Sequence, residues 1–516
     1  MAKTDRQKIF GREHFEDDSQ KDRKWHYDLT IARNAQTQAP IVLREDIRQH
    51  GCTILGQEDK KKKDILLTSI ASDLERKVCN DEAREMALRK LIKKGRADYN
   101  IPNHAEGEKI IFKDSDVIPR PGCQKDYREV LDRYPSCCVI LVSPDKALCD
   151  EAARLAVSVG ISPKYVDSDL KYDPKRYTEF GRYTAALNPF MMPKTRKNLT
   201  LKDAAARAVQ ISEMTAAMIG MISPAAQSGD FWTGFNAEAL RVIVFLVVLY
   251  YNRVKACDVT WTEVLRAWNN DVSELRTMTA ALEGLLERED SSIPELSAAL
   301  ACAKDFLKDD GARLRDYTYS VRNNINTFLS DTHFGCLTSD RKCIDLVESF
   351  RTGDVIIVNS DTKYGNTAPS VTGCVFQQMV RQAMFDRDIV PGSFPLPVIE
   401  YIDSLEMMEP AGWFEPMAAL GRKFGFWMVC AIETTALLDT VSRELGLQHL
   451  LLREGAVICL NREAVKDLAI ELPALAQAAS MKNMMPDGDK IFLLTKNKPP
   501  FIDFQLGICS QQSSGE

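Results

Sequence analysis

The residues best suited to chemistry stand where a short apolar strand meets a helix. Cys52–Gly56 has the composition of a buried strand ending in glycine, and Ile65–Val78 carries apolar residues at helical spacing. The four consecutive lysines Lys60–Lys63 stand between them. A strand, a glycine and a helix N-terminus together form an anion-binding site, because the backbone N–H groups of the first helical turn are free there. This segment is therefore a candidate phosphate-binding loop.

The spacing of this loop can be compared with what nucleotide phosphates need. With Gly56 as the first glycine, Lys61, Lys62 and Lys63 take the places of the second glycine, the phosphate-binding lysine and the Mg²⁺-binding hydroxyl. The order of strand, glycine and helix fits a phosphate-binding loop, but most of the residue types at these positions do not. Four cations at a helix start oppose the helix dipole by roughly 0.3–1 kcal/mol each, and a bound anion would reverse that sign. Lys60 and its neighbours are either anion ligands or a solvated charged run.

A second candidate is the carboxylate that follows a later strand. Leu396–Ile402 is an expected strand and Asp403 comes next, which suits a Walker-B role in which the carboxylate holds Mg²⁺. Hydrolysis also needs a group that orients water, usually a glutamate directly after that aspartate. Ser404 stands in this place, and Glu406 would need an unusual loop to substitute. Asp403 is thus either a metal ligand or a carboxylate that caps a loop.

Two further polar pieces flank the expected strand Phe426–Ile432. Gly421–Gly425 precedes it and contains Arg422, and Glu433 follows it. Polar residues at the carboxyl end of a central strand face any ligand in the crevice of an open α/β sheet. Glu433 is therefore a candidate site residue. Arg422 is either a group that reaches a ligand or part of an exposed helix terminus.

The elements that must position these residues alternate between strand and helix. Cys137–Val142 is a continuous apolar run of the kind buried inside a parallel sheet. We expect one helix from Asp145 to Gly160 and another over Asp81–Lys94, separate from Ile65–Val78. This alternation predicts a doubly wound α/β sheet. Further strands are expected at Lys109–Phe112, Tyr165–Asp167, Gly353–Asn359, Ala456–Leu460 and Lys490–Leu494, and further helices at Ser370–Asp386 and Phe414–Phe424.

The stretch Leu199–Leu329 differs, because nearly all of it has helical periodicity. We predict an all-α insertion. Its most apolar run, Val242–Tyr251, is well short of the ~18–20 residues of a membrane helix, so we expect it to form the core of the insertion. The expected helices are Leu201–Met221, Phe231–Val254, Thr260–Asn270, Val272–Arg288, Pro294–Leu307 and Leu314–Leu329.

Length and composition limit the classes of protein. The 516 residues predict several domains, at roughly 150 residues for each. A hydrophobic content of 45% excludes disorder as a description of the whole chain, and a net charge of −6 excludes a globally basic nucleic-acid wrapper. The 14 cysteines contain no CxxC pair, so we expect neither a zinc framework nor a disulfide scaffold. The charged Met1–Arg6 predicts no signal peptide.

The order of these pieces resembles that of a known family. It is similar to the type IV coupling proteins, the RecA-like P-loop ATPases of conjugation and type IV secretion, which are related to FtsK/HerA-type DNA translocases. The resemblance covers roughly residues 40–500. The motifs that carry it are Arg44–His50, Asn188–Phe190, Phe231–Trp232, Ile402–Asp403, Arg422–Gly425 and Ala431–Glu433.

The resemblance implies an architecture. It implies an α/β fold of the RecA-like type, with a mostly parallel sheet, helices on both faces, and an all-α domain that receives substrate. The expected divisions are a flexible N-terminal arm at 1–38, the first part of the nucleotide-binding domain at 39–198, the all-α domain at 199–330, the second part at 331–505 and a tail at 506–516.

The resemblance also implies site residues and cofactors. Asp145 matches the acidic residue after the strand that follows the loop, and Arg422 matches a finger that reaches the nucleotide of a neighbouring subunit. Glu433 falls where the family has a glutamine that senses the γ-phosphate. The implied cofactors are ATP, held by Gly56, Lys60–Lys63 and Asp145, and Mg²⁺, held by Asp403.

The departures from the family matter as much. The Gly-Lys-Ser/Thr of the loop, the glutamate after Asp403 and the usual pair of N-terminal membrane helices are missing. An alternative alignment places the loop at Gly122–Asp126, with a more ordinary spacing to Asp145. We prefer Gly56 because its preceding strand and following helix are stronger. Neither loop offers a hydroxyl to Mg²⁺.

These features predict a coupling-protein-like component of a conjugation or type IV secretion machine, with degenerate Walker A residues and weak or absent ATP hydrolysis. It would recruit or dock a protein substrate or a relaxase–DNA complex. The implied partners are other components of the machine, among them an active coupling ATPase or further copies of the chain. We expect a cytoplasmic protein, recruited to the inner membrane rather than inserted in it. The alternatives are an active DNA-translocating ring ATPase with an unorthodox loop and a nucleotide-free structural adaptor.

Overall fold

The structure is a computed structural model, and it describes most of the chain outside the two ends. The strand predicted at Lys109–Phe112, most of the helix predicted at Leu314–Leu329 and the tail 506–516 lie outside the described residues. The described residues are 27–34, 40–99, 117–192, 200–222, 231–268, 272–288, 292–312, 314–315, 318–319, 322–323, 326, 343–360, 371–387, 396–407, 414–437, 451–452, 455–472, 486, 491–495, 501–502 and 504–505.

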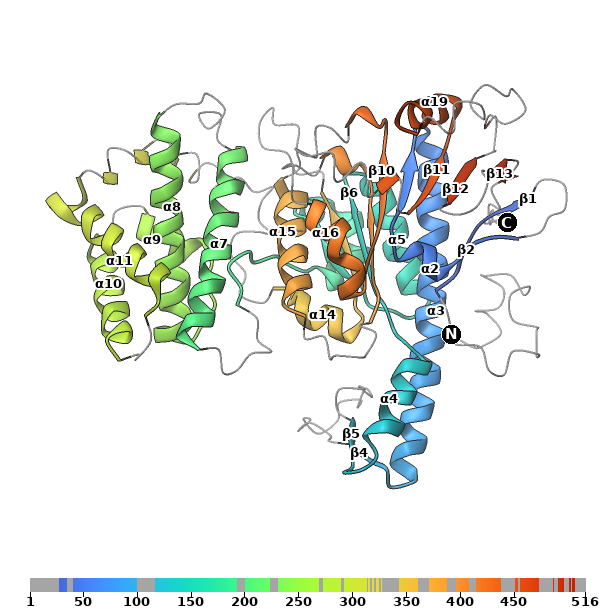
Figure 1. The fold of residues 1–516 in the computed structure, drawn as a ribbon, viewed down its shortest axis with the longest axis horizontal. Helices are drawn as coiled ribbons and strands as arrows, with labels where there is room; N and C mark the ends of the chain where they lie inside the picture. Colours follow the sequence, from blue (N-terminus) through green and yellow to red (C-terminus); the bar gives the residue numbers. More distant parts are fainter. Residues whose placement is uncertain are drawn as a thin grey trace.

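A nine-stranded sheet organises the described residues (Figure 1). Its order is β13-β12-β11-β3-β10-β9-β6-β8-β7, and every neighbouring pair from β11 to β7 is parallel. Strands β12 and β13 add antiparallel pairs at one edge. The predicted strands are confirmed within one or two residues, as β3 (Cys52–Leu55), β6 (Cys138–Ser143), β7 (Lys164–Val166), β8 (Val355–Asn359), β9 (Val398–Ile402), β10 (Phe426–Ile432), β11 (Ala456–Cys459) and β12 (Phe492–Thr495); β13 is Phe501–Ile502.

Both faces of the sheet are buried, which explains why its strands are continuous apolar runs. Within β6, Ile140 and Val142 pack into one hydrophobic cluster, and Val139 and Leu141 pack into the other. Helices α3 and α5 cover one face, and α15 and α16 cover the other (Figure 1). The predicted α/β class with helices on both faces is confirmed. The bounds of these helices are α3 Asp59–Lys93, α5 Lys146–Ser158, α15 Val371–Phe385 and α16 Phe414–Leu420.

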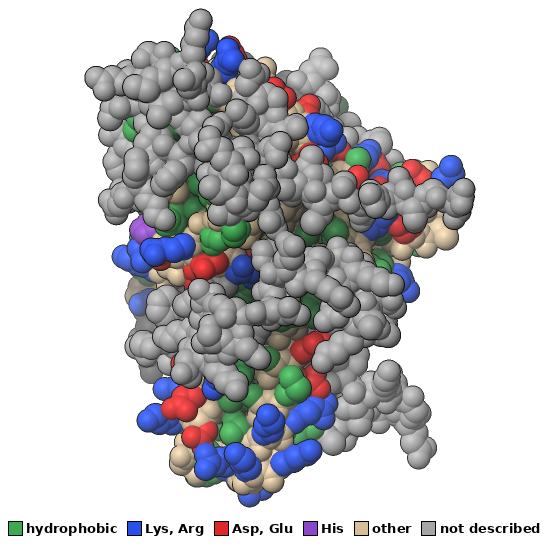
Figure 2. All heavy atoms as spheres, turned by 90° about the vertical axis from the view of Figure 1, so that its right-hand side faces the viewer, with side chains coloured by type: hydrophobic (Ala, Val, Ile, Leu, Met, Phe, Trp, Pro, Cys, Tyr) green, Lys and Arg blue, Asp and Glu red, His purple; other side chains and the backbone are tan. Residues whose placement is uncertain are grey.

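The prediction of two separate helices at 65–78 and 81–94 is wrong, because α3 is one helix from Asp59 to Lys93. No glycine or proline interrupts it, and Asn80 is held by its neighbours: its Nδ2 donates to the carbonyl of Pro135 at 2.8 Å. Asp81 continues the helix through ion pairs to Lys77 and Arg84. The far half of α3 carries α4 (Gln124–Arg133) and the two-stranded sheet of β4 (Ala97–Tyr99) and β5 (Val117–Pro119). Figure 2 shows Lys and Arg side chains gathered over this lower part of the molecule.

The predicted flexible arm at 1–38 contains a folded segment at residues 27–34. Tyr27 is 1% exposed, and its hydroxyl donates to the carbonyl of Pro135 at 2.5 Å. β1 (Leu29–Asn34) pairs with β2 (Pro40–Leu43) and with β14 (Phe504–Gln505). The apolar residues at 27, 29 and 31 alternate as a half-buried strand requires, and this signal was hidden by the polar residues around it. Residues 1–26 lie outside the described residues.

The described residues of the helical region form helices α7 to α11, on the left of Figure 1. Helix α8 is central, and its residues 242–250 are all buried, as predicted for the core of the insertion. A π-helical turn, Tyr251–Lys255, ends it. None of the helices in the described parts of the chain combines the length and the apolar character needed to span a membrane. The helices are α7 Leu201–Ile222, α8 Phe231–Tyr250, α9 Trp261–Trp268, α10 Val272–Leu286 and α11 Pro294–Phe306.

Candidate functional site

The connection from β3 to α3 is shorter than predicted. Only three residues, 56–58, separate the two elements, because α3 begins at Asp59 instead of near residue 65. Gly56 is buried with φ +125°, and its N–H donates to the carbonyl of Ile432 at 3.1 Å. A Cβ at Gly56 would lie 3.2 Å from Asn461 Oδ1, so glycine is needed there. Lys60–Lys63 therefore belong to the first turns of the helix, and not to a loop that could surround phosphates.

Lys62 is held by the carboxylate predicted to bind Mg²⁺. Its Nζ lies 2.9 Å from Asp403 Oδ1 and 3.5 Å from Asp59 Oδ1. The side chains of Lys62 and Asp403 are only 13% and 2% exposed. Burial lowers the pKa of the Lys62 ammonium. The attraction of the carboxylates of Asp403 and Asp59 more than offsets this, so the pKa of Lys62 lies above its usual value. Lys62 and Asp403 thus form a nearly buried ion pair between the start of α3 and the end of β9.

Ser143 joins this ion pair to a second one. Its Oγ donates to Asp403 Oδ2 at 2.7 Å and accepts the N–H of Asp145 at 2.9 Å. Asp145 pairs with Lys63 and caps α5, accepting the N–H of Ala147 at 2.9 Å. Burial raises the pKa of Asp145, but Lys63 and the N–H groups of Leu148 and Ala147 together outweigh it, so that the pKa lies below the usual value. Ser143 was not predicted from the sequence, in which it is a single polar residue at the end of an apolar run.

A third link ties the connection between β3 and α3 to the end of β10. Gln57 Nε2 donates to Glu433 Oε2 at 2.8 Å, and Glu433 is exposed directly after β10. Lys61 Nζ donates to the carbonyl of Leu460 at 3.0 Å, after β11. Lys60 is exposed and takes no part in these contacts. The structure therefore brings together Gly56, Lys61, Lys62, Lys63, Asp145, Asp403 and Glu433 at the carboxyl ends of neighbouring strands.

Glu406 reaches the same edge through an unusual turn. Ser404 has φ +63°, a left-handed conformation that costs a residue with a side chain of this kind about 1 kcal/mol or more. The 3₁₀ helix η9 (Leu405–Met407) follows, and Glu406 Oε2 is buried with no hydrogen-bond partner among the described residues. Burial raises the pKa of Glu406 to about 7. The negative charges of Glu433 and Asp403 also raise this pKa, and the positive charge of Lys62 lowers it. The chain thus makes an unusual turn between Asp403 and Glu406, as Glu406 was expected to need.

Arg422 is not part of this cluster within one chain. It lies in the 3₁₀ helix η10 (Gly421–Phe424), which precedes β10, and its Nη1 lies 2.9 Å from His50 Nε2. His50 itself precedes β3, which is parallel to β10. Arg422 is exposed at the amino ends of the strands, about 20 Å of β10 away from Glu433. Arg422 could therefore reach such a cluster only in a neighbouring molecule.

The alternative loop at Gly122–Asp126 is placed far from these strand ends. Gly122 precedes α4, and the strand before it, β5, belongs to the two-stranded sheet rather than to the nine-stranded one. Gly122 and Lys125 are exposed near the C-terminus of α3. At 1.5 Å per residue, the 35 residues of α3 put roughly 50 Å between the two candidate loops.

The donor set around Asp403 does not fit Mg²⁺ as it stands. The described residues contain no group of three His, Cys, Asp or Glu side chains that could hold a metal ion. Lys62 and Ser143 occupy both oxygens of Asp403, and a lysine stands in the position of the Mg²⁺-binding hydroxyl. A cation would first have to displace the Lys62 ammonium. What the arrangement does provide is two ion pairs, Lys62–Asp403 and Lys63–Asp145, that tie the start of α3 to the ends of β9 and β6.

Comparison with known proteins finds similarity in structure alone. No family model and no curated protein matches the sequence. Solved structures similar to this chain include the unbound bacterial conjugative coupling protein TrwBdeltaN70 (13% identity, TM-score 0.38) and the plasmid coupling protein TrwB with ADP and Mg²⁺ (14%, 0.36), each covering 83% of this chain and 92% of the other. VirB4 of Thermoanaerobacter pseudethanolicus is also similar (10%, 0.44), over 92% of this chain and 95% of that one.

The chain itself has an α/β fold with a mostly parallel sheet, the class that its sequence predicts. At these identities the similarity extends to the fold alone. What the chain does has to be inferred from its own side chains.

Proposed function

We propose that this chain is a coupling-protein-like component of a conjugation or type IV secretion machine that docks substrate and hydrolyses ATP weakly or not at all. The observation that carries the proposal is the 2.9 Å ion pair between Lys62 Nζ and Asp403 Oδ1. It joins the residue in the place of the phosphate-binding lysine to the residue in the place of the Mg²⁺ ligand. Each is the other's counter-ion, so neither is available for a nucleotide without breaking a nearly buried pair.

The chemistry of phosphoryl transfer explains why this arrangement would be slow. Enzymes of this type work by positioning the phosphates and by stabilising charge, with little covalent chemistry of their own. Here the helix begins at Asp59, Lys63 stands in the place of the hydroxyl, and Ser404 stands in the place of the water-orienting carboxylate. An arginine finger is worth ~10³–10⁵ in rate only when the remaining parts are present.

The proposed role leaves substrate handling to the rest of the chain. The motif resemblance supports the machine and its partners: other components of the secretion or conjugation apparatus, and a protein or relaxase–DNA substrate. We propose that residues 199–330 face the substrate, that 39–198 and 331–505 form the RecA-like part, and that the chain works in the cytoplasm, recruited to the inner membrane by its partners.

Two observations favour an active ring ATPase as the second candidate. Glu406 brings a carboxyl group to the strand ends through the left-handed Ser404, and Arg422 is exposed where it could contact a neighbouring copy. In such a ring, nucleotide would have to separate Lys62 from Asp403. Turnover and its dependence on Asp403 therefore distinguish the two candidates.

A steady-state assay of ATP hydrolysis with Mg²⁺ tests the proposed function. We expect turnover far below the ~1 s⁻¹ at the low end of ordinary enzymes, with and without DNA. Asp403→Asn should leave this low rate unchanged, because no catalytic Mg²⁺ is lost, and Asp46→Asn on the surface is the matched control. A turnover near 1 s⁻¹ that disappears in Asp403→Asn would favour the active ring.

A further inference from the structure

A buried carboxyl group lies in the middle of β9, away from the strand-end ion pairs. Glu400 is 0% exposed, and its partners in the neighbouring strands are the apolar Ile140 of β6 and Met428 of β10. A glutamate is almost never buried to this extent unless it is paired. Glu400 forms no ion pair with any residue that the structure describes, and its one recorded hydrogen bond comes from a neutral amide.

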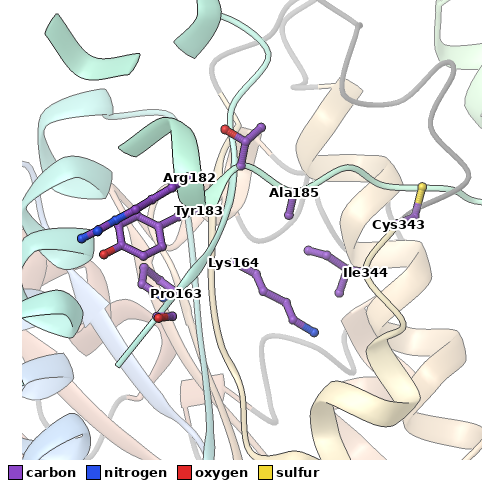
Figure 3. A pocket seen from close by; sticks show the side chains of 9 residues that line it. Pro163, Lys164, Arg182, Tyr183, Ala185, Cys343 and Ile344 are labelled. Carbon is purple, nitrogen blue, oxygen red and sulfur yellow. The ribbon is translucent and has the colours of Figure 1, made fainter. Parts of the chain in front are cut away.

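A lysine at one edge of the sheet shows the usual arrangement. Lys164 of β7 lines a cavity of about 630 Å³ and lies between Tyr183 and Ile344 in Figure 3. Its Nζ lies 2.6 Å from Asp354 Oδ2. Even this half-buried charge has a counter-ion, whereas the fully buried Glu400 has none among the described residues. The contrast indicates that Glu400 is kept in the core as a neutral acid.

The amide that contacts Glu400 belongs to α15, a helix that is enclosed on all sides. Gln377 Nε2 donates to Glu400 Oε1 at 2.8 Å, while Glu400 Oε2 and Gln377 Oε1 have no partner among the described residues. Every residue from Val371 to Val380 is buried. One hydrophobic cluster continues from β9 through α15 to α7, and Figure 1 shows α15 between the sheet and α7. The helix α15 is therefore the layer that joins the sheet to the helical region.

Polar contacts attach α15 to α7 on its other side. Arg207 Nη2 of α7 lies 2.8 Å from Oδ2 of Asp386, the residue directly after α15, and the two side chains are 11% and 16% exposed. Gln382 Nε2 donates to Gln210 Oε1 at 3.4 Å. A movement of α15 away from β9 would therefore be transmitted to α7.

The other titratable groups around Glu400 do not compensate for its charge. Burial raises the pKa of the Cys430 thiol on β10 well above its usual value, and Glu400 contributes to this shift. Arg381 is the one charged side chain of α15, and the charge recorded beside it is that of Glu213 on α7. The partner on β6 is Ile140. An ionised Glu400 would thus have no cation beside it in the described part of the chain.

We propose that Glu400 is a proton-controlled latch that holds α15, and through it α7, against the sheet. The protonated carboxyl group is neutral and can remain buried under α15. The ionised group needs water, because an unpaired charge in an apolar core costs a large free energy. Since α15 covers this face of β9, water reaches Glu400 when α15 separates from the strand. The inference goes beyond the proposed function and does not depend on it.

The pH range of the latch follows from the burial of Glu400. Burial raises the pKa of Glu400 to about 8 in the closed state, even though the hydrogen bond from Gln377 lowers it. A hydrated glutamate has a pKa of about 4.3. The closed state therefore binds the proton more tightly, and closure is strongest at low pH. Each pH unit between about 4.3 and 8 should raise the open population about tenfold, with little further change above that range.

Hydrogen–deuterium exchange of the full chain, read by mass spectrometry of its peptides at about pH 6.5 and about pH 8.5, tests the proposal. Wild type is compared with Glu400→Gln at the same pH, so that the intrinsic pH dependence of exchange cancels. We expect the ratio of wild-type to variant rates in α15 and α7 to rise about tenfold or more between the two pH values. Peptides from β11 and α5 should keep one ratio. Glu295→Gln, at an exposed position of α11, is the matched control and should behave as wild type.

Two results would overturn the proposal. The first is a wild-type to Glu400→Gln ratio in α15 and α7 that is the same at both pH values, because the charge on Glu400 would then not control this contact. The second is an equal rise in β11 and α5, because ionisation would then act on unfolding of the whole chain and not on α15. Exchange is measured without ATP, so neither result bears on the proposed function.

Discussion

Replacing Arg48 by alanine is expected to lower the free energy of unfolding by about 3–5 kcal/mol, the usual cost of leaving one member of a buried ion pair alone. Arg48 and Asp73 are 2% and 0% exposed, and their two hydrogen bonds measure 2.9 and 2.7 Å. The Tyr401 hydroxyl also donates to Asp73, so the cluster joins α2 (Glu45–Arg48), α3 and β9. The midpoint of urea unfolding, followed by tryptophan fluorescence, measures the loss.

A neighbouring arginine provides the matched control for this prediction. Arg44 pairs with Asp46 on the surface, where the two side chains are 58% and 57% exposed. Surface pairs contribute about 0–1 kcal/mol, so Arg44→Ala should change the midpoint little. Similar losses for Arg44→Ala and Arg48→Ala would contradict the account of a buried cluster. The Arg44–His50 motif, used above as a sign of family resemblance, thus contains a structural residue.

The second large effect is a pH dependence of stability that comes from Glu400. This residue of β9 is 0% exposed; its Oε1 accepts Gln377 Nε2 at 2.8 Å, and its Oε2 has no partner among the described residues. Burial raises the pKa of Glu400 to about 8, although the hydrogen bond from Gln377 acts in the opposite direction. In the unfolded chain the pKa is about 4.3. The folded state therefore binds the proton more tightly, and its stability falls as pH rises from about 4.5 to 8, by about 1.4 kcal/mol per pH unit.

The variant Glu400→Gln isolates this contribution, because glutamine imitates the protonated acid and cannot ionise. We expect wild type and variant to unfold at similar urea concentrations at pH 5, and the variant to be more stable by about 3 kcal/mol at pH 7. Glu295→Gln, at an exposed position of α11, should follow the wild type at both pH values. A constant difference between wild type and Glu400→Gln from pH 5 to pH 8 would contradict a neutral Glu400 in the folded state.

Much of the fold could be predicted because its central strands are buried on both faces. Runs such as Cys137–Val142 and Phe426–Ile432 have no other stable place than the middle of a parallel sheet. The predictions that were wrong concern segments whose structure depends on tertiary contacts. The helix α3 continues through Asn80 because Pro135, 55 residues away in sequence, satisfies the asparagine amide. Tyr27 is ordered by that same distant carbonyl, which no local pattern reveals.

The residues of the candidate site could be predicted from the sequence better than their arrangement in space. The sequence predicted Lys62, Lys63, Asp145 and Asp403 as site residues, and the structure places them together. It did not foresee that they would pair with one another, because pairing depends on where α3 begins. Asp59 starts the helix early, and each lysine then faces the carboxylate of a different strand end. Ser143 was missed because a single serine in an apolar run carries little signal until its neighbours across the sheet are known.

Calorimetric titration of the full chain with ATP and Mg²⁺ tests the central claim most directly, with Lys62→Ala and Lys125→Ala measured in parallel. If the Lys62–Asp403 pair closes the crevice, wild type should bind with a Kd above roughly 100 µM, a free energy of only about −5 kcal/mol. Lys125→Ala should then match wild type, because Lys125 is remote from the strand ends. A micromolar Kd that is lost in Lys62→Ala would show that Lys62 is free to hold phosphate, and would contradict the claim.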